Sequence, residues 1–404
     1  MSEWKEVRLG DLCHKVCSGG TPKSTCSVYY EGGTIPWLNT KEVNYNRIYE
    51  TESHITEEGL NNSSAKLIDA NAVVVAMYGA TAGRVAIAKV PMTTNQACCN
   101  LMIDSSKADY DYIFYYLSNN YKQLLSMANG AAQQNLNAQV IKDYIVSLPP
   151  LDTQHRIASI LSALDDKIAV NRRICENLES QAQALFKHWF IDFAPFKDGK
   201  FVESELGMIP EGWRVGRLEE LGEIVGGATP SKAEESYYCN DGIPWLTPKD
   251  LSNCCCKFTS RGEIDITQEG YKSCSAKIMP KGSVLFSSRA PIGYVTIAKN
   301  DICTNQGFKS VVPKYAGTAY IFYLLKRNTK RIESMASGTT FKEASGSLMK
   351  SLAVIIPPKY KIDEFGELTT DIFSEQESLE NESSRLSTLR DTLLPKLMSG
   401  QIKV

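Results

Sequence analysis

The sequence predicts an α/β protein of two domains that are related by an internal repeat and separated by an antiparallel two-helix coiled coil. Three observations predict this fold. The tetrapeptide IPWL occurs twice, with Trp37 and Trp245 placed 208 residues apart. Further matches continue at nearly this spacing through both halves of the chain. A long stretch with heptad spacing follows each half.

The repeat extends well beyond the tetrapeptide. Further matched segments, at spacings of 208 or 210 residues, are Thr21-Pro22 with Thr229-Pro230, Lys41 with Lys249, Asn95-Gln96 with Asn305-Gln306, and Pro149-Pro150 with Pro357-Pro358. Small changes in spacing indicate loop insertions rather than a different fold. The chain is therefore one unit written twice.

Each unit is expected to form an α/β domain followed by a long helix. AVVVAMYG and RVAIAK are β-rich runs, and DYDYIFYYLSNNYKQLLSMA has helical apolar spacing. SVLFSS, GYVTIAK and TAYIFYLLKRNTKRIESMA repeat this order. Because a Pro-Pro pair ends each domain, we predict domains at 1–150 and 208–358, a helical region with a linker at 151–207, and a second helical region at 359–404. Four tyrosines at helical spacing are predicted to lie in the core: Tyr112, Tyr115, Tyr320 and Tyr323.

Both helical regions carry a heptad seam of coiled-coil or partner-binding positions. The first seam is Ile157, Leu161, Leu164, Ile168, Asn171, Cys175, Leu178, Ala182, Leu185 and Trp189. Shifting it by 208 residues gives Phe365, Thr369, Ile372, Gln376, Leu379, Ser383, Leu386, Arg390, Leu393 and Leu397. The second seam is more polar, and Leu368 and Leu389 beside it are expected to widen its apolar stripe. One seam alone could be ordinary core packing, but two in matching places favour an intramolecular antiparallel pair.

Composition excludes several classes of protein. The 404 residues are 43% hydrophobic and 22% charged, which suits a folded chain of two or three domains. No apolar run is long enough to cross a membrane and the first residues do not form a signal peptide, so we expect a cytoplasmic protein. Most of the cysteines are expected to be reduced. Cys13, His14, Cys17 and Cys26 lack a second spaced pair, so no metal site is predicted.

Catalysis by this chain is not expected. A methyltransferase needs a glycine-rich nucleoside-binding turn and a tetrapeptide of the Asn-Pro-Pro-Tyr type, whose polar first side chain holds the target amino group. Here the Pro-Pro pairs follow Leu148 and Ile356. The segments GATAG and SSRAPIG lack the pattern of a phosphate-binding loop, and no histidine recurs between the halves. We therefore predict no catalytic residues.

The sequence resembles the DNA-specificity subunits of type I restriction-modification enzymes over essentially the whole chain. The resemblance lies in the doubled IPWL, the segments GRVAIAK and GYVTIAK, both TNQ marks, and the endings QALFKHWFIDFAPF and LRDTLLPKLMSGQIKV. It implies a target-recognition domain at each end of a two-helix coiled coil, with approximate twofold symmetry. It also implies an asymmetric bipartite site in double-stranded DNA. Two methylation and two restriction subunits would be the partners, and S-adenosylmethionine, ATP and Mg would belong to them.

Charge supports only a modest DNA-binding surface. Lysine and arginine number 12 against 14 acidic residues in 1–150, and 19 against 14 in 208–358. A strongly basic stripe, the usual mark of phosphate binding, is missing from the first domain. This argues against a self-sufficient DNA binder, but it fits a subunit whose partners also contact the duplex.

Candidate DNA-binding residues are basic, amide or hydroxyl side chains on turns or on loops that differ between the copies. They are Lys41, Arg84, Gln133, Gln134, Asn135, Lys249, Arg289, Thr339, Thr340 and Lys342. Arg84 and Arg289 are expected to align within a residue or so. Because Asn95-Gln96 and Asn305-Gln306 recur, framework hydrogen bonding is favoured for them. A self-contained methyltransferase and an interaction scaffold that never touches DNA are the competing hypotheses.

Overall fold

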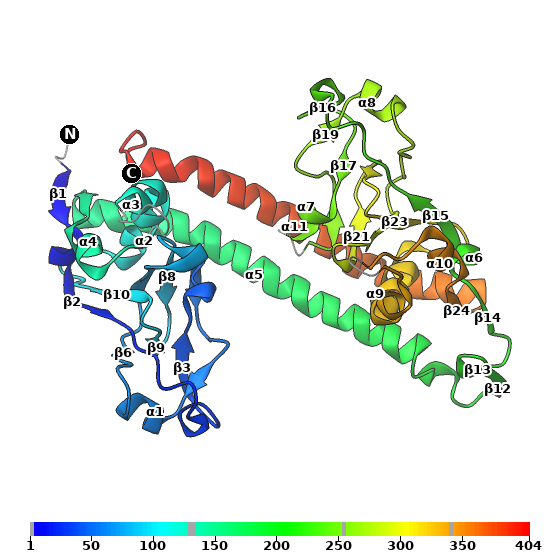
Figure 1. Ribbon diagram of the computed structural model, residues 1–404, viewed down its shortest axis with the longest axis horizontal. Coiled ribbons are helices and arrows are strands. Elements are labelled where there is room, and N and C mark those ends of the chain that lie inside the picture. Colours follow the sequence, from blue (N-terminus) through cyan, green and yellow to red (C-terminus); the bar gives the residue numbers. More distant parts are fainter. Residues whose placement is uncertain (1–3, 128–134, 253–255, 339–341) are drawn as a thin grey trace. The chain divides into compact units, whose positions relative to one another are not determined.

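The chain forms two compact units, one of residues 1–168 with 385–404 and one of residues 169–384. The computed structural model describes residues 4–127, 135–252, 256–338 and 342–404. Each unit holds one α/β domain and parts of two long helices, α5 (Leu151–Phe190) and α11 (Lys359–Met398) (Figure 1). The predicted α/β fold with two long helices is confirmed.

A five-stranded sheet in the order β2-β10-β7-β8-β4 forms the centre of the first unit. Its strands are β2 (Cys13–Ser18), β4 (Asn46–Ile48), β7 (Ala72–Ala76), β8 (Val85–Ala88) and β10 (Cys98–Ile103). Neighbouring strands are antiparallel, except β4 and β8, which are parallel. Alternate residues of β7 pack into different apolar clusters, Val73 and Val75 into one and Val74 and Ala76 into the other. Both faces are therefore covered, which explains the unbroken apolar runs in the sequence.

Smaller elements cover this sheet. A second sheet has the order β5-β3-β9-β6, with β3 (Ile35–Leu38), β5 (His54–Ile55), β6 (Leu67–Ile68) and β9 (Met92–Thr94). The remaining strands are β1 (Lys5–Arg8) and β11 (Ile145–Leu148), which pair with each other. The short helices are α1 (Glu57–Asn61), α2 (Tyr110–Asn119), α3 (Tyr121–Ser126) and α4 (Ala138–Asp143). Tyr112 and Tyr115 of α2 are buried in the core, as predicted.

The second unit repeats the same sheet order, β15-β23-β20-β21-β18. Its strands are β15 (Gly222–Gly226), β18 (Phe258–Thr259), β20 (Val284–Ser288), β21 (Ile292–Ala298) and β23 (Lys309–Pro313). Again only the last pair, β18 and β21, is parallel among these neighbours. The sequence repeat is therefore also a repeat of the fold.

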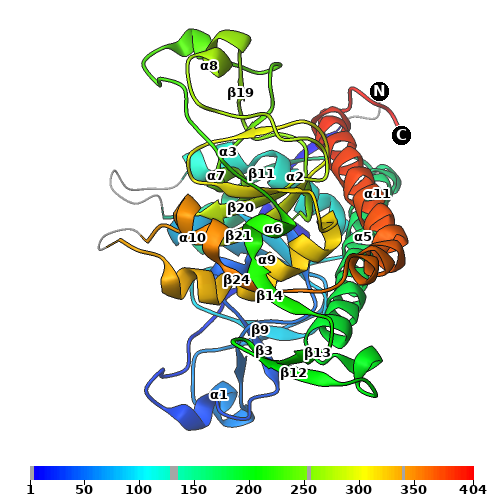
Figure 2. The same ribbon diagram turned by 90° about the vertical axis from the view of Figure 1, so that its right-hand side faces the viewer.

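The other elements of the second unit complete its α/β domain. Paired strands are β14 (Arg214–Arg217) with β24 (Ala353–Ile356), β16 (Tyr238–Cys239) with β19 (Asp265–Ile266), β17 (Trp245–Leu246) with β22 (Cys303–Thr304), and β12 (Phe201–Ser204) with β13 (Gly207–Pro210). The helices are α6 (Leu218–Leu221), α7 (Pro248–Ser252), α8 (Gln268–Lys272), α9 (Thr318–Met335) and α10 (Gly346–Ser351). Within this unit α8 and β19 lie at the end away from β14 (Figure 2). Tyr320 and Tyr323 of α9 are buried, as predicted.

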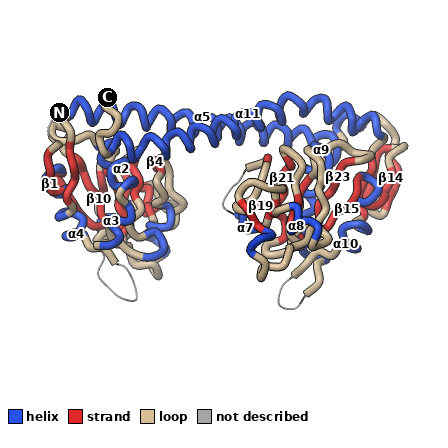
Figure 3. Tube along the Cα trace, turned by 90° about the horizontal axis from the view of Figure 1, so that it is seen from above, coloured by secondary structure: helices blue, strands red, loops and turns tan. Residues whose placement is uncertain are grey.

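Within each unit α5 and α11 run side by side (Figure 3). In the second unit Asn171 donates to Ser383, and the Gln376 side chain donates to the Cys175 carbonyl. Because the partner number falls as the α5 number rises, the helices are antiparallel. All positions of both predicted seams are buried or half-buried, and the predicted coiled-coil pairing is confirmed.

The polar seam positions make specific contacts rather than leaving gaps. Asn171 is fully buried, and its amide also donates to the Glu382 carboxylate at 2.7 Å. In the first unit the Arg390 guanidinium donates to Asp165 at 2.7 Å. The expectation that Leu368 and Leu389 widen the second seam is wrong, because both are about half exposed. Polar side chains occupy the contact line there, so no wider apolar stripe is needed.

Each α/β domain begins with a tryptophan that packs against the end of a long helix or the segment beyond it. Trp213 packs edge to face on Phe193 and Phe196 and tilted on Phe190, at the end of α5. In the first unit Trp4 lies against Gly400, just after α11 ends. None of the helices in the described parts of the chain combines the length and apolar character needed to cross a bilayer.

Candidate nucleic-acid interface

The repeated tryptophan sits at the same junction in both units. β3 pairs in parallel with β9 at Trp37, and β17 pairs in parallel with β22 at Trp245. The indole N–H of Trp37 donates to the Gly20 carbonyl and that of Trp245 donates to the Ala228 carbonyl, each at 3.0 Å. Both acceptors lie in the loop that follows the first strand of the large sheet. IPWL therefore fixes this loop to the small sheet.

The repeated asparagine–glutamine pairs hold the same loop. The hydroxyl of Thr21 donates to the Gln96 side chain, and that of Thr229 donates to Gln306. The asparagine before each glutamine accepts a backbone N–H from two residues further on, at 3.1 and 2.8 Å. The prediction that these pairs serve the framework is confirmed by these internal hydrogen bonds.

The repeated lysines lie on the short turn after IPWL, and each contacts a carboxylate. Lys41 pairs with Glu52 at 2.5 Å and Lys249 pairs with Glu263 at 3.2 Å. The hydrogen bond with Glu52 raises the pKa of Lys41, so this lysine is charged at neutral pH. All four side chains are at least 63% exposed. Exposed ion pairs are weak, so a phosphate can replace the carboxylate at little cost.

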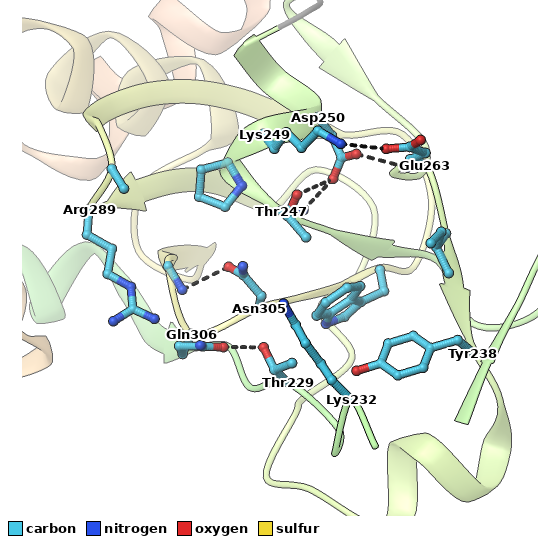
Figure 4. A pocket seen from close by; sticks show the side chains of 15 residues that line it. Thr229, Lys232, Tyr238, Thr247, Lys249, Asp250, Glu263, Arg289, Asn305 and Gln306 are labelled. Carbon is cyan, nitrogen blue, oxygen red and sulfur yellow. Dashed lines mark hydrogen bonds and ion pairs between the residues drawn. The ribbon is translucent and has the colours of Figure 1, made fainter. Parts of the chain in front are cut away.

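A pocket of about 650 Å³ opens beside Lys249 in the second unit. Three basic side chains line it, Lys232, Lys249 and Arg289, and they reach it from different sides (Figure 4). Tyr238 and Gln306 contribute to the wall. Arginine and lysine match guanine edges and phosphates. The pocket therefore has the side chains needed to contact a DNA strand.

Arg289 is tied to the loop that follows α9. Its guanidinium lies 3.5 Å from the Glu343 carboxylate, and the Lys309 ammonium lies 3.3 Å from the same group. The backbone N–H of Ala344 donates to the Ser288 carbonyl at 2.9 Å. The turn after β20 and the loop after α9, which the sequence suggested separately as DNA-binding segments, are thus brought together at one end of a central strand.

The loop after the domain helix approaches the same hairpin in both units. Four predicted residues lie outside the described part of the chain: Gln133, Gln134, Thr339 and Thr340. Asn135 and Lys342 are described, and both are exposed. The N–H of Leu136 donates to the Met77 carbonyl at 2.9 Å, which matches the Ala344 bond of the second unit.

Arg84 and Arg289 do not occupy equivalent positions. Arg84 directly precedes β8, where the second unit has Tyr294, and Arg289 follows β20, where the first unit has Tyr78. The expectation that the two arginines align is wrong, because they lie on opposite arms of corresponding hairpins. Arg84 donates to the Asn44 side chain at 2.8 Å. The two units therefore present different side chains from the same hairpin.

Sequence reasoning missed three charged residues of this region, Lys232, Lys309 and Glu343. Lys232 follows the repeated Thr-Pro where the first unit has Ser24, and this difference beside a repeated motif could have marked it. Lys309 and Glu343 had no such signal, because they are 34 residues apart and meet only in the folded domain.

The cysteines carry no metal-binding arrangement in the described residues. Cys13, Cys17 and Cys26 are free thiols, and burial raises the pKa of the Cys13 thiol to about 12. No three histidine, cysteine, aspartate or glutamate side chains gather as metal ligands in the ranges that the structure describes.

Comparison with known proteins identifies the family. The family model described as "Type I restriction modification DNA specificity domain" matches residues 1–180 and again residues 210–384. The chain is 29% identical to the MjaIX type I restriction enzyme specificity subunit of Methanocaldococcus jannaschii, over the whole chain and 94% of that protein. It is 24% identical to the HindI specificity subunit of Haemophilus influenzae, over all of both chains.

A solved structure has the same fold. The crystal structure of a type I restriction-modification S subunit from M. genitalium superimposes with a TM-score of 0.60 at 16% identity, covering 98% of this chain and 96% of that one. Two copies of the family domain cover most of the chain, and each contains one of the two like-folded α/β domains. The chain therefore belongs to the family of type I restriction-modification DNA specificity subunits, with two recognition domains.

Proposed function

We propose that this subunit reads an asymmetric bipartite DNA site, with one block of base pairs read by each recognition domain. The proposal rests on one observation. The two domains share a repeated framework, but they present different side chains at the ends of its loops. The hairpin that presents Arg289 in the second domain presents Tyr78 in the first. Equal frameworks with unequal reading groups would recognise unequal sequences.

The candidate contacts divide by chemistry. Arg289 and Lys232 come from positions that differ between the domains, so we assign them to base edges in the second block. Lys41 and Lys249 recur, so we assign them to phosphates, which carry no sequence information. Arg84, Asn135 and Lys342 are exposed or partly exposed at the same edge of their domains, and we assign them to the reading surface of their own domain.

Catalysis and cofactors are assigned to other subunits. Neither Pro-Pro pair follows the polar residue that a methyltransferase uses to hold its target base. The first recognition domain has a net charge of −2 (12 − 14) and the second only +5 (19 − 14), so partner subunits would supply many of the phosphate contacts. We propose two methylation and two restriction subunits, which would bind S-adenosylmethionine, ATP and Mg. We take residues 1–150 and 208–358 as the recognition domains, 151–207 as the first helical region with its linker, and 359–404 as the second helical region. The helical regions would hold the methylation and restriction subunits.

Methylome sequencing tests the proposal. Deletion of the gene should remove methylation from one bipartite motif across the host genome. Replacing residues 1–150 with another recognition domain should then change one block and leave the other. A simultaneous change of both blocks would contradict one block per domain. An unchanged methylome after deletion would favour a scaffold that never touches DNA.

A further inference from the structure

Lys257 is a buried lysine directly before β18, at the edge of the large sheet of the second unit. Its side chain is only 7% exposed. Removing an ammonium group from water is costly, so a buried lysine needs several well-placed partners. The partners of Lys257 come from three helices of the same unit.

The Lys257 ammonium makes three hydrogen bonds. It donates to Glu179 of α5 at 2.9 Å, to the side-chain carbonyl of Gln376 of α11 at 2.8 Å, and to the hydroxyl of Tyr323 of α9 at 2.9 Å. Its nitrogen also lies 3.5 Å from the centre of the Phe373 ring, which belongs to α11. One side chain therefore joins the α/β domain to both long helices.

A second contact fixes the backbone at the same place. The Glu380 carboxylate of α11 accepts the N–H of Lys257 at 2.8 Å and the N–H of Phe258 at 3.1 Å. The Thr296 hydroxyl of the neighbouring strand donates to the Lys257 carbonyl at 3.0 Å. We name Lys257, Glu179, Gln376, Tyr323 and Glu380 the Lys257 network.

The first unit has a buried cation one strand position away from the place that corresponds to Lys257. Arg47 lies in β4, the counterpart of β18, and its side chain is 13% exposed. It donates to Asp111 at 2.9 Å and to the Tyr115 hydroxyl at 3.3 Å, and it lies 3.8 Å from Asp165 of α5. Tyr115 corresponds to Tyr323 at the 208-residue spacing. Both domains thus attach to their helices through a cation, a tyrosine and a helix carboxylate.

We propose that Lys257 is a positioning residue that sets the orientation of the second recognition domain on its helices, and hence the spacer accepted between the two blocks. This inference rests on the proposed function. The apolar contacts around it, such as Phe322 and Phe258 against Phe373, are non-directional and tolerate rotation. Hydrogen bonds from one ammonium group to three helices are directional and do not tolerate rotation. A shift of about 3.4 Å at the reading loops equals one base pair.

The charge of Lys257 can be removed by pH. Burial lowers the pKa of Lys257 to about 8, against the raising effect of Glu179. Burial alone would raise the pKa of Glu179, but Lys257 and a hydrogen bond from Lys326 lower it to about 2. Burial raises the pKa of Glu380 and also that of Tyr323. Between about pH 7 and 9 Lys257 is therefore the group of the network that loses its charge.

The titration of Lys257 distinguishes an effect on the orientation of the second domain from an effect on the stability of the fold. The pKa of Lys257 is lower in the folded than in the unfolded chain, so the unfolded chain binds more protons at about pH 9. Its titration therefore raises the free energy of unfolding as pH rises. Weaker spacer discrimination at that pH cannot come from unfolding caused by this lysine.

The test uses the complex of the full chain with its methylation subunits. Methylation rates are measured on duplexes that carry both blocks and the native spacer, or a spacer one base pair longer or shorter. Lys257→Met should lower the preference for the native spacer by roughly tenfold while leaving both blocks unchanged. Lys257→Arg should restore most of the preference. The wild-type preference should fall between about pH 7 and pH 9, and that of Lys257→Arg should not.

Lys326→Met is the matched control. Lys326 also contacts Glu179, at 2.6 Å, but its side chain is 41% exposed, so its loss should leave the spacer preference unchanged. If Lys257→Met does not fold, Glu380→Gln weakens the backbone contact and should relax the preference in the same direction. An unchanged preference in folded Lys257→Met would overturn the inference. A wild-type complex with no bipartite preference would instead overturn the proposed function.

Discussion

Replacing Trp245 with phenylalanine would test why the tetrapeptide occurs twice. Trp245 is 7% exposed, and its indole N–H donates to Ala228. Losing this hydrogen bond costs about 1 kcal/mol and leaves the Ala228 carbonyl without its donor. The smaller ring leaves a cavity of roughly 40 Å³, which adds about 1 kcal/mol at about 24 cal/mol per Å³, with a further contribution from the lost apolar contact. The second domain should lose about 2 to 3 kcal/mol of stability in total.

Trp37→Phe is the matched change in the first unit. Trp37 has the same hydrogen bond, to Gly20, but its side chain is only partly buried. Because part of the space it leaves is open to water, its loss should cost about 1 to 2 kcal/mol.

Hydrogen exchange measured by mass spectrometry can separate the two units. Trp245→Phe should speed exchange in β17 and β22 by roughly 30- to 150-fold and leave β3 and β9 unchanged. In methylation assays it should weaken discrimination at the second block alone. Equal loss of protection in both units, or an effect on the first block, would refute the reasoning that each tryptophan holds only its own reading loop.

Further experiments give separable outcomes. Arg289→Ala should relax recognition at one base pair of the second block by about tenfold, which a methylome would show. Lys249→Ala should weaken binding to all sequences and reduce the slope of log affinity against log salt concentration by about one, which a salt titration would show. One added turn of about four residues should lengthen the spacer by about one or two base pairs when it is placed in α5 near Asn171 and matched by a turn in α11 near Ser383, and a methylome would show this. Two added residues should instead destabilise the helix pair. The isolated chain should show no saturable binding of S-adenosylmethionine in calorimetry.

The repeat made the fold predictable, because pattern and spacing are local properties. The apolar runs around Val74 and Leu285 predicted strands, and both residues are buried in strands, β7 and β20. The seam positions predicted the helix pair, including the buried Asn171. The domain tyrosines were placed in the core for the same reason. The strands and the core tyrosines needed only the order of residues within one segment, and the helix pair needed two such segments in matching places.

The reading surface could be predicted only in part, because its residues meet through the fold. Lys232, Arg289 and Glu343 lie on three loops far apart in the sequence, and no local pattern links them. The same holds for Lys257, whose hydrogen-bond partners are 66 to 119 residues away. The arginine mismatch has a similar cause, since only strand register shows that Tyr294 stands where the first unit has Arg84.

The repeat itself indicates where specificity must lie. Residues that recur in both domains, such as Trp37 with Trp245, bond within their own domain or pair with a neighbouring carboxylate, so they act alike whatever DNA is bound. A recurring group cannot make the two blocks differ. The difference must come from positions where the copies diverge on the same framework, and Arg289, placed where the first unit has Tyr78, is such a position. Exchanging side chains at these loop ends, rather than in the framework, is therefore the change that should move sequence preference without loss of folding.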